Sequence, residues 1–327
     1  MNIPPSYKIN SEIIDLISQI EANLYYLSSL RLSSDFNKKI IRINILKSSL
    51  FSAKIEGNPL ELDDLKTKNK SKTKDEIFNI VKAIVYIQKK VKKDFLLNKN
   101  FILDLHSLIM TGTVGLTKNF RKEMGAIFNQ SGRAIYLSPP PTKIKNYIDK
   151  LIDYTNKEED NPFINAFISH LIFEKIHPFL DGNGRVGRLL ISTIILSKKG
   201  KDYFFVPFEK ELEKERESYY YYLDVGLKNT NEYLIFMLKM FLKSVEDLKI
   251  TIENENKKTI FLPPRQEEIY LIIKDHRLVS FDQIRRRFLK VPERTLRYDL
   301  KKLVEKDLII KIGKTRGSYY RETDFKP

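Results

Sequence analysis

Apolar residues recur at helical spacing along most of the chain. Ile13, Leu16, Ile17 and Ile20 share one face of a helix, because residues three or four apart lie above one another on a helix. The same spacing predicts helices over residues 39–55, 75–91, 101–110, 144–154, 162–176, 219–223 and 233–245, and one that leaves a glycine-rich motif and runs to residue 196. The pattern predicts a mainly helical protein.

The helical pattern is interrupted between residues 111 and 141. Four glycines lie in this segment, which ends in AIYLSPPP. The short apolar run Ala134–Leu137 stands directly before a cluster of prolines, and it therefore predicts a strand or a β-hairpin.

The last part of the chain is organised differently. Residues 251–260, TIENENKKTI, are polar and precede two prolines, which predicts a linker. Helices are expected over residues 266–274, 281–288 and 292–306, followed by two strands around the basic turn GKTRG. Three helices and a hairpin are the outline of a winged helix-turn-helix domain. The expected regions are an N-terminal helical region (1–98), a core (99–250), the linker (251–260) and a winged-helix domain (261–327).

The composition is that of a globular protein and argues against a disulfide-bonded, membrane-spanning or secreted one. Hydrophobic residues make up 42% and charged residues 31% of the 327 residues, which is ordinary for a globular protein. Cysteine is absent, which excludes disulfides and thiolate metal sites. No apolar run reaches the roughly 18 residues that span a bilayer, and the N-terminus does not resemble a signal peptide. A cytoplasmic protein is expected.

The segment His177–Arg188, HPFLDGNGRVGR, concentrates polar chemistry between two apolar helices, and it holds three of the 12 glycines. A glycine loop at a helix N-terminus presents free N–H groups to an anion. Arg185 and Arg188 are three residues apart, so both can reach that anion. Asp181 is a natural Mg²⁺ ligand beside a phosphate. A neutral His177 could accept a proton from a hydroxyl group.

This combination indicates transfer of a phosphoryl or nucleotidyl group from a Mg²⁺-bound nucleotide. Taken singly, each part has an ordinary explanation: a glycine turn, solvated arginines and a packed histidine. The sequence contains neither GxxxxGK(S/T) nor HExxH, so a Walker A loop is excluded and a zinc site is disfavoured.

The segment matches the Fic family signature HPFx(D/E)GNGRxxR at every defined position. The resemblance implies a mainly α fold with a Fic helical core, and an enzyme that moves AMP from Mg²⁺-ATP to a Ser, Thr or Tyr hydroxyl of a target protein, releasing pyrophosphate. It implies His177 as catalytic base and Asp181 as the metal ligand. The nucleotide-binding residues it implies are Phe179, Asp181, Gly182, Asn183, Gly184, Arg185, Arg188, Tyr219 and Tyr220.

Further segments resemble other parts of Fic proteins. AIYLSPPP resembles the β-hairpin flap that binds the target's backbone, and YYYYL at 219–223 resembles a tyrosine pair near the adenine, with plain aromatic core as the alternative. The RxxQ pattern common before the flap is missing, since Arg121 is followed by Lys122, Glu123 and Met124. This departure leaves the detail of the flap open.

The segment SAKIEGN, residues 52–58, matches the Fic inhibitory pattern (S/T)xxxE(G/N). By resemblance, Glu56 pairs with Arg188 and obstructs the γ-phosphate, which implies a self-inhibited enzyme with an N-terminal inhibitory helix. A carboxylate and a phosphate compete for the same guanidinium. The alternative is an ordinary last-turn residue before the helix cap Gly57.

The C-terminal region is the more basic part of a chain whose net charge is +16: its last 67 residues hold 17 Lys and Arg against 10 Asp and Glu. The helix over 292–306 places Arg294, Arg297, Tyr298, Lys301 and Lys302 largely on one side. The face is typical of a recognition helix that binds DNA, and equally of a protein-docking or dimerising surface.

Three readings of the whole chain therefore stand. The first is a protein adenylyltransferase with ATP and Mg²⁺, a protein target and a possible homodimer. The second is a DNA-binding regulator whose Fic core only senses a nucleotide. The third keeps the fold but uses another donor, or removes AMP. An intact His177 favours an enzyme over a sensor, because sensing needs no base.

Overall fold

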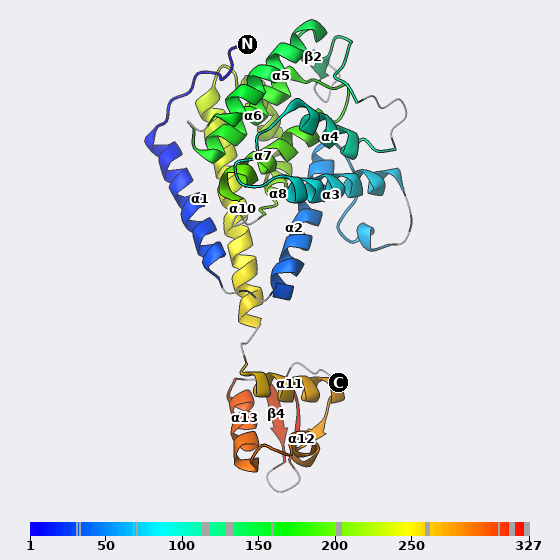
Figure 1. The fold of residues 1–327 in the computed structure, drawn as a ribbon, viewed down its shortest axis with the longest axis vertical. Coiled ribbons are helices and arrows are strands. Elements are labelled where there is room, and N and C mark those ends of the chain that lie inside the picture. Colours follow the sequence, from blue (N-terminus) through cyan, green and yellow to red (C-terminus); the bar gives the residue numbers. More distant parts are fainter. Residues whose placement is uncertain are drawn as a thin grey trace. The chain divides into compact units, whose positions relative to one another are not determined.

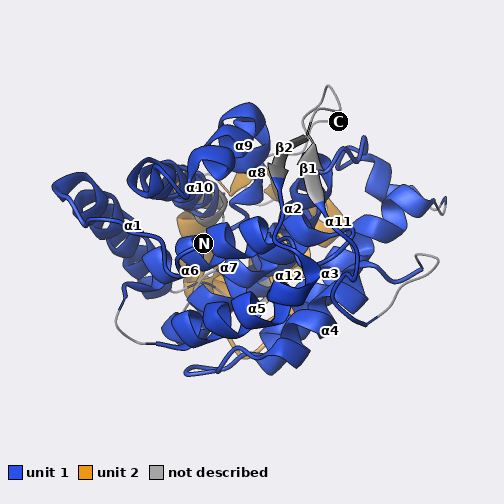
Figure 2. Cartoon of the chain, turned by 90° about the horizontal axis from the view of Figure 1, so that it is seen from above, with its two compact units in different colours: residues 1–253 blue, residues 254–327 orange. Residues whose placement is uncertain are grey.

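The computed structural model describes residues 1–30, 32, 34–67, 69, 71–112, 118–128, 134–157, 160–200, 205–258, 262–306, 308–313 and 318–323. The chain divides into two compact units, Met1–Glu253 (unit 1) and Asn254–Pro327 (unit 2), coloured separately in Figure 2. Each unit has its own hydrophobic core. The described part of the chain is mainly helical, as the sequence predicts (Figure 1).

Unit 1 is almost entirely helical. Its elements are α1 (Ser11–Ser29), α2 (Ser34–Ile55), the short 3₁₀ helix η1 (Asp64–Lys66), α3 (Lys72–Lys90), α4 (Lys99–Ile109), β1 (Ala126–Phe128), β2 (Ala134–Leu137), α5 (Pro141–Asn156), α6 (Pro162–Ile176), α7 (Asn183–Lys199), α8 (Glu209–Lys214), α9 (Arg216–Val225) and most of α10 (Thr230–Lys258). Several of the helices begin at a side chain that accepts a backbone N–H: Asn10 for α1, Ser71 for α3, Asn98 for α4 and Asn161 for α6.

Helix α6 forms the centre of unit 1. All its residues from Phe163 to Ile176 are buried, as expected of a helix that is apolar on every side. Helices α5 and α7 pack against it, and the ring of Phe167 lies 6.5 Å from that of Phe208 and 6.1 Å from that of Phe241. Among the described residues, no helix is both long enough and apolar enough to cross a membrane.

Strands β1 and β2 pair antiparallel, with Ala126 opposite Leu137 and Ile127 opposite Tyr136. The strand expected over Ala134–Leu137 is present with these bounds. The turn of this hairpin, residues 129–133, lies outside the described residues.

Unit 2 contains α11 (Pro264–His276), β3 (Val279–Ser280), α12 (Phe281–Arg287), α13 (Glu293–Glu305), β4 (Ile309–Ile312) and β5 (Tyr319–Glu322). Its three strands form an antiparallel sheet in the order β3-β5-β4. Ser280 and Gln283 form a reciprocal capping box at the start of α12. The three helices and the hairpin strands lie where the sequence predicts them, whereas β3 was not expected. The tip of the basic turn, residues 314–317, lies outside the described residues.

The predicted linker over residues 251–260 contains the boundary between the two units, at Glu253/Asn254, but most of it is helical. Residues 251–258 are the last turns of α10, and residues 259–261 lie outside the described part. Glu and Lys are good helix formers. Val245, Leu248 and Ile252 are buried and continue one apolar face, so this polar segment continues a helix and is not an irregular connection.

We expect Phe167→Ala to lower the free energy of unfolding by about 3–5 kcal/mol, since it removes a fully buried ring and leaves a cavity. Phe78→Ala on α3 is the matched control, because Phe78 is 40% exposed. Urea denaturation followed by far-ultraviolet circular dichroism measures both. Equal losses for the two variants would contradict the placement of α6 at the centre.

Candidate active site

The motif loop joins α6 to α7 through two left-handed residues. His177 ends α6 with φ 48° and ψ 60°, and its N–H bonds to Phe173 O at 2.9 Å. Gly182, with φ +83°, precedes α7. A side chain at Gly182 would be strained and would press on the end of α4. The loop is therefore tightly held between two packed helices.

The side chain of Asn183 locks this loop. Its Oδ1 accepts from the Phe179 N–H at 2.9 Å, and its Nδ2 donates to Phe179 O at 2.9 Å. Phe179 is only 1% exposed, and its ring stacks on His106 with centroids 3.7 Å apart. Phe179 thus anchors the loop in the core, and the amide of Asn183 is engaged within the protein.

The backbone N–H groups at the start of α7 are the donors that can bind an anion. The first bond of the helix runs from Val186 N–H to Gly182 O at 3.0 Å. The Gly182 N–H itself donates to Asp181 Oδ1 at 2.6 Å. The N–H groups of residues 183–185 have no acceptor within the helix, and the helix dipole favours a negative charge beside them.

A carboxylate already lies at this helix mouth. Arg188 is 1% exposed. It donates to Ser52 Oγ at 3.0 Å, to Ser52 O at 2.9 Å and to Glu56 Oε1 at 2.9 Å. A methyl group on Gly184 would collide with the same Oε1. Burial disfavours the charged form of Arg188, but attraction to Glu56 holds its pKa above the ordinary value.

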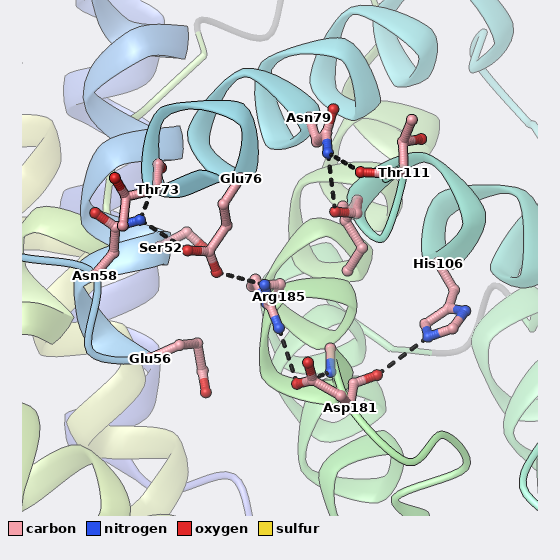
Figure 3. Close-up of polar contacts among 12 residues, drawn as sticks. Ser52, Glu56, Asn58, Thr73, Glu76, Asn79, His106, Thr111, Asp181 and Arg185 are labelled. Carbon is pink, nitrogen blue, oxygen red and sulfur yellow. Dashed lines mark hydrogen bonds and ion pairs between the residues drawn. The ribbon is translucent and has the colours of Figure 1, made fainter. Parts of the chain in front are cut away.

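Arg185 lies between two carboxylates (Figure 3). Its Nη1 donates to Glu76 Oε1 on α3, and its Nη2 donates to Asp181 Oδ1 at 2.9 Å. The Asp181 side chain is 68% exposed, and its backbone oxygen lies 3.1 Å from His106 Nε2. Asp181 is therefore oriented by its neighbours while it faces solvent.

His177 is partly buried, and burial lowers its pKa below the ordinary value. Its imidazole is therefore neutral at neutral pH and can accept a proton. Arg121 fixes its backbone: Nε donates to His177 O at 2.8 Å, the Arg121 N–H to Pro178 O at 2.9 Å, and Nη2 to Pro139 O at 2.7 Å. Because Pro139 follows β2, Arg121 also ties the hairpin to the motif loop.

A buried hydrogen-bonded chain lies behind Arg188. Tyr233 OH donates to Phe167 O at 3.1 Å, so His170 Nδ1, 2.7 Å away, is the donor to Tyr233. His170 Nε2 then accepts from Tyr219 OH at 3.1 Å. Burial lowers the pKa of His170 to about 3 and raises that of Glu174 to about 8. The 3.8 Å approach of His170 to Glu174 is therefore not an ion pair.

The two tyrosines predicted near the adenine have different surroundings. Tyr219 is 1% exposed and belongs to this buried chain, whereas Tyr220 is 38% exposed. The Tyr220 hydroxyl donates to Ile55 O at 3.2 Å, at the end of α2. Tyr220 is thus the member of the pair whose ring is accessible beside Glu56.

The structure gathers Glu56, Arg188 and the motif loop at the start of α7, with His177 and Asp181 in the same loop. Sequence reasoning gave no role to Glu76 or His106, because nothing in their spacing connects them to the motif. Arg121 attracted notice only through its departure from a family pattern, and its four backbone acceptors are visible only in the structure.

Comparison with known proteins finds a family that this part of the chain resembles. The model of the Fic/DOC family matches residues 96–195. The matched segment extends from just before α4 into α7 and includes the whole motif loop.

Part of the chain is also similar to curated proteins. A probable protein adenylyltransferase from Aquifex aeolicus (strain VF5) is 29% identical over 144 residues, which are 43% of this chain and 43% of that protein. Protein adenylyltransferase Fic from Drosophila mojavensis is 27% identical over 157 residues, 46% of this chain and 29% of that protein. The chain thus spans less than half the length of these relatives.

The fold is shared more widely. The crystal structure of a Fic family protein from Desulfovibrio desulfuricans G20 matches with a TM-score of 0.79 at 20% identity, covering 99% of both chains. At this identity the match shows the fold alone.

We expect His170 to make the folded protein acid-sensitive. Its folded pKa of about 3 lies below its ordinary 6.5. Below pH 6.5 the unfolded chain therefore binds a proton that the folded chain does not, and stability is lost as the pH falls, by about 1.4 kcal/mol per pH unit. Above pH 6.5 this group contributes no pH dependence.

The measurement is urea denaturation of the wild type and His170→Gln at about pH 6 and about pH 5. The difference in unfolding free energy between them should shrink by about 1.4 kcal/mol over that interval. His276→Gln removes an exposed histidine. It is the control that shows how much the loss of a histidine elsewhere changes the pH dependence of the unfolding free energy. A constant difference between wild type and His170→Gln would contradict a neutral buried His170.

Proposed function

We propose that the protein is a protein adenylyltransferase that transfers AMP from Mg²⁺-ATP to a hydroxyl group of a target protein. One observation carries the proposal: the Glu56 carboxylate, bonded to Arg188 and close against Gly184, marks a place at the mouth of α7 that accepts an anion. Similarity to relatives named as protein adenylyltransferases supports the proposal.

The residues of the loop fit a Mg²⁺ that arrives with the nucleotide. Asp181 is exposed, and its Oδ2 has no hydrogen-bond partner in the described part of the chain. The described part of the chain contains no cluster of three or more His, Asp or Glu side chains that could hold a metal ion by protein ligands alone. Mg²⁺ is often held by one carboxylate, waters and phosphate oxygens. When bound, it would neutralise part of the phosphate charge.

His177 supplies the base in this proposal. Its neutral imidazole accepts the proton of the target's hydroxyl, the hydroxyl oxygen bonds to the α-phosphorus, and the bond to pyrophosphate breaks. The backbone N–H groups of residues 183–185 and the Arg188 guanidinium would bind the phosphate oxygens.

We further propose that Glu56 inhibits this reaction. Its carboxylate and a phosphate of ATP would compete for Arg188, whose Nε and Nη2 also donate to Ser52. The alternatives are a DNA-binding regulator that only senses a nucleotide, and an enzyme of the same fold that uses another donor or removes AMP. The neutral His177 favours transfer over sensing, because sensing needs no base.

If unit 2 is a winged-helix domain, it has a separate candidate surface that could bind duplex DNA. Arg294, Arg297, Tyr298 and Lys301 are exposed on α13. Glu293 lies within 4 Å of Arg297, and Glu305 lies within 4 Å of Lys301 and of Lys302, which reduces the net charge of the face. Protein docking on the same face is the competing interpretation.

We expect Glu56→Gly to raise self-modification by α-labelled ATP about tenfold or more, because it frees a charge-assisted hydrogen bond of Arg188. Adding His177→Ala should abolish the label. Radiolabel incorporation measures both, and mass spectrometry of the labelled protein identifies the transferred group.

The matched control is Glu61→Gly, because Glu61 is an exposed carboxylate five residues away that pairs with Lys54. It should label like the wild type. Equal labelling of the wild type and Glu56→Gly would remove the inhibitory role. Undiminished labelling after His177→Ala would remove the base.

For unit 2, fluorescence anisotropy with a duplex oligonucleotide should show binding that weakens as salt increases. Replacing Arg294 and Lys301 by Ala should reduce the salt dependence by about two phosphate contacts. Lys239→Ala, an exposed lysine of unit 1, is the control. Binding that is absent at low salt would favour protein docking.

A further inference from the structure

The first turns of α3 connect two distant segments through one carboxylate. Glu76 Oε1 accepts from Arg185 Nη1 in the motif loop, and Oε2 accepts from Asn58 Nδ2 at 2.7 Å, just beyond α2 (Figure 3). Asn58 also donates to Thr73 O at 2.9 Å. Both oxygens of Glu76 are thus engaged, and its side chain is only 25% exposed.

Arg185 transmits this restraint to Asp181. Its guanidinium is planar, so fixing Nη1 on Glu76 fixes the direction of Nη2. Nη2 donates to Asp181 Oδ1 at 2.9 Å, and the Arg185 side chain is 9% exposed. Asp181, in contrast, is 68% exposed. The row Glu76–Arg185–Asp181 therefore connects a half-buried carboxylate, through a buried guanidinium, to the exposed carboxylate that would meet Mg²⁺.

Helix α3 supports the other wall of the site as well. One turn after Glu76, Asn79 Nδ2 donates to Thr111 O at 2.8 Å, at the end of α4. His106 of α4 lies 3.1 Å from the backbone oxygen of Asp181. Asp181 is thus held through its side chain by Arg185 and through its backbone by α4, and α3 contacts both Arg185 and the end of α4.

We infer that Glu76 is a positioning residue: it holds the Arg185 guanidinium, and through it the Asp181 carboxylate, in the orientation that receives the Mg²⁺-bound nucleotide. The inference rests on the proposed function. It assigns to Glu76 no contact with the nucleotide, so Glu76 acts only through Arg185.

The test measures binding of a fluorescent ATP analogue with Mg²⁺ to the Glu56→Gly, His177→Ala double variant, which lacks both the inhibitory carboxylate and the base. Adding Glu76→Gln should weaken binding about tenfold, as expected for loss of one charge-assisted hydrogen bond. Glu76→Asp, which retains the carboxylate, should bind more tightly than Glu76→Gln. Asp75→Asn, at an exposed carboxylate of the same helix, should change binding less than about twofold.

A double-mutant cycle separates positioning from a merely structural role. In an Arg185→Gln background, Glu76→Gln should change binding less than about twofold, because the guanidinium through which Glu76 acts is already absent. The same tenfold loss with and without Arg185 would overturn the inference, and so would no loss in the parent background.

The two levels of the proposal fail differently. If the parent double variant binds no nucleotide, the proposed function fails, and this inference fails with it. If the parent binds and Glu76→Gln binds equally well, only the role of Glu76 is removed. Urea denaturation of every variant shows that each is folded.

Discussion

Arg188 carries a positive charge in the protein interior, with 1% of its surface exposed. A buried charge is costly unless it is paired and hydrogen-bonded. Here the partners are Ser52 and Glu56, at the end of α2. The site therefore requires an anion at the mouth of α7, and the protein supplies one from its own chain. On the proposed function, a phosphate that binds there competes with this carboxylate for the guanidinium.

The surrounding helices fix the position of the loop that precedes α7. Helix α6 is buried on all sides and packs on α7, so the loop between them has little freedom. The reciprocal bonds between Asn183 and Phe179 hold the loop from inside, and Arg121 holds it from the hairpin. Helix α3 adds Glu76. Charged groups of three different segments thus converge on one helix terminus, where the dipole and free N–H groups favour negative charge.

Much of the fold could be predicted from periodicity, and the exceptions have physical reasons. Helix α6 has the predicted bounds, since its apolar run begins at Pro162 and ends before the glycine loop. The six-residue α8 and the two-residue β3 were not expected, because such short elements depend on their packing partners. The last turns of α10 were taken for a linker, because a polar sequence at a helix end resembles one until Ile252 is seen to be buried.

By itself, the sequence determined the chemical groups of the candidate site: the histidine, the carboxylate, the glycines and the two arginines lie within one twelve-residue segment, and local loop and helix preferences bring them together. The pairing of Glu56 with Arg188 was expected only from the resemblance to a family, and the partners of Arg185 were visible only in the tertiary structure. Glu56 is 132 residues from Arg188 and Glu76 is 109 residues from Arg185. Contacts over such separations follow from how α2 and α3 pack near α7, and spacing along the chain carries no record of that packing.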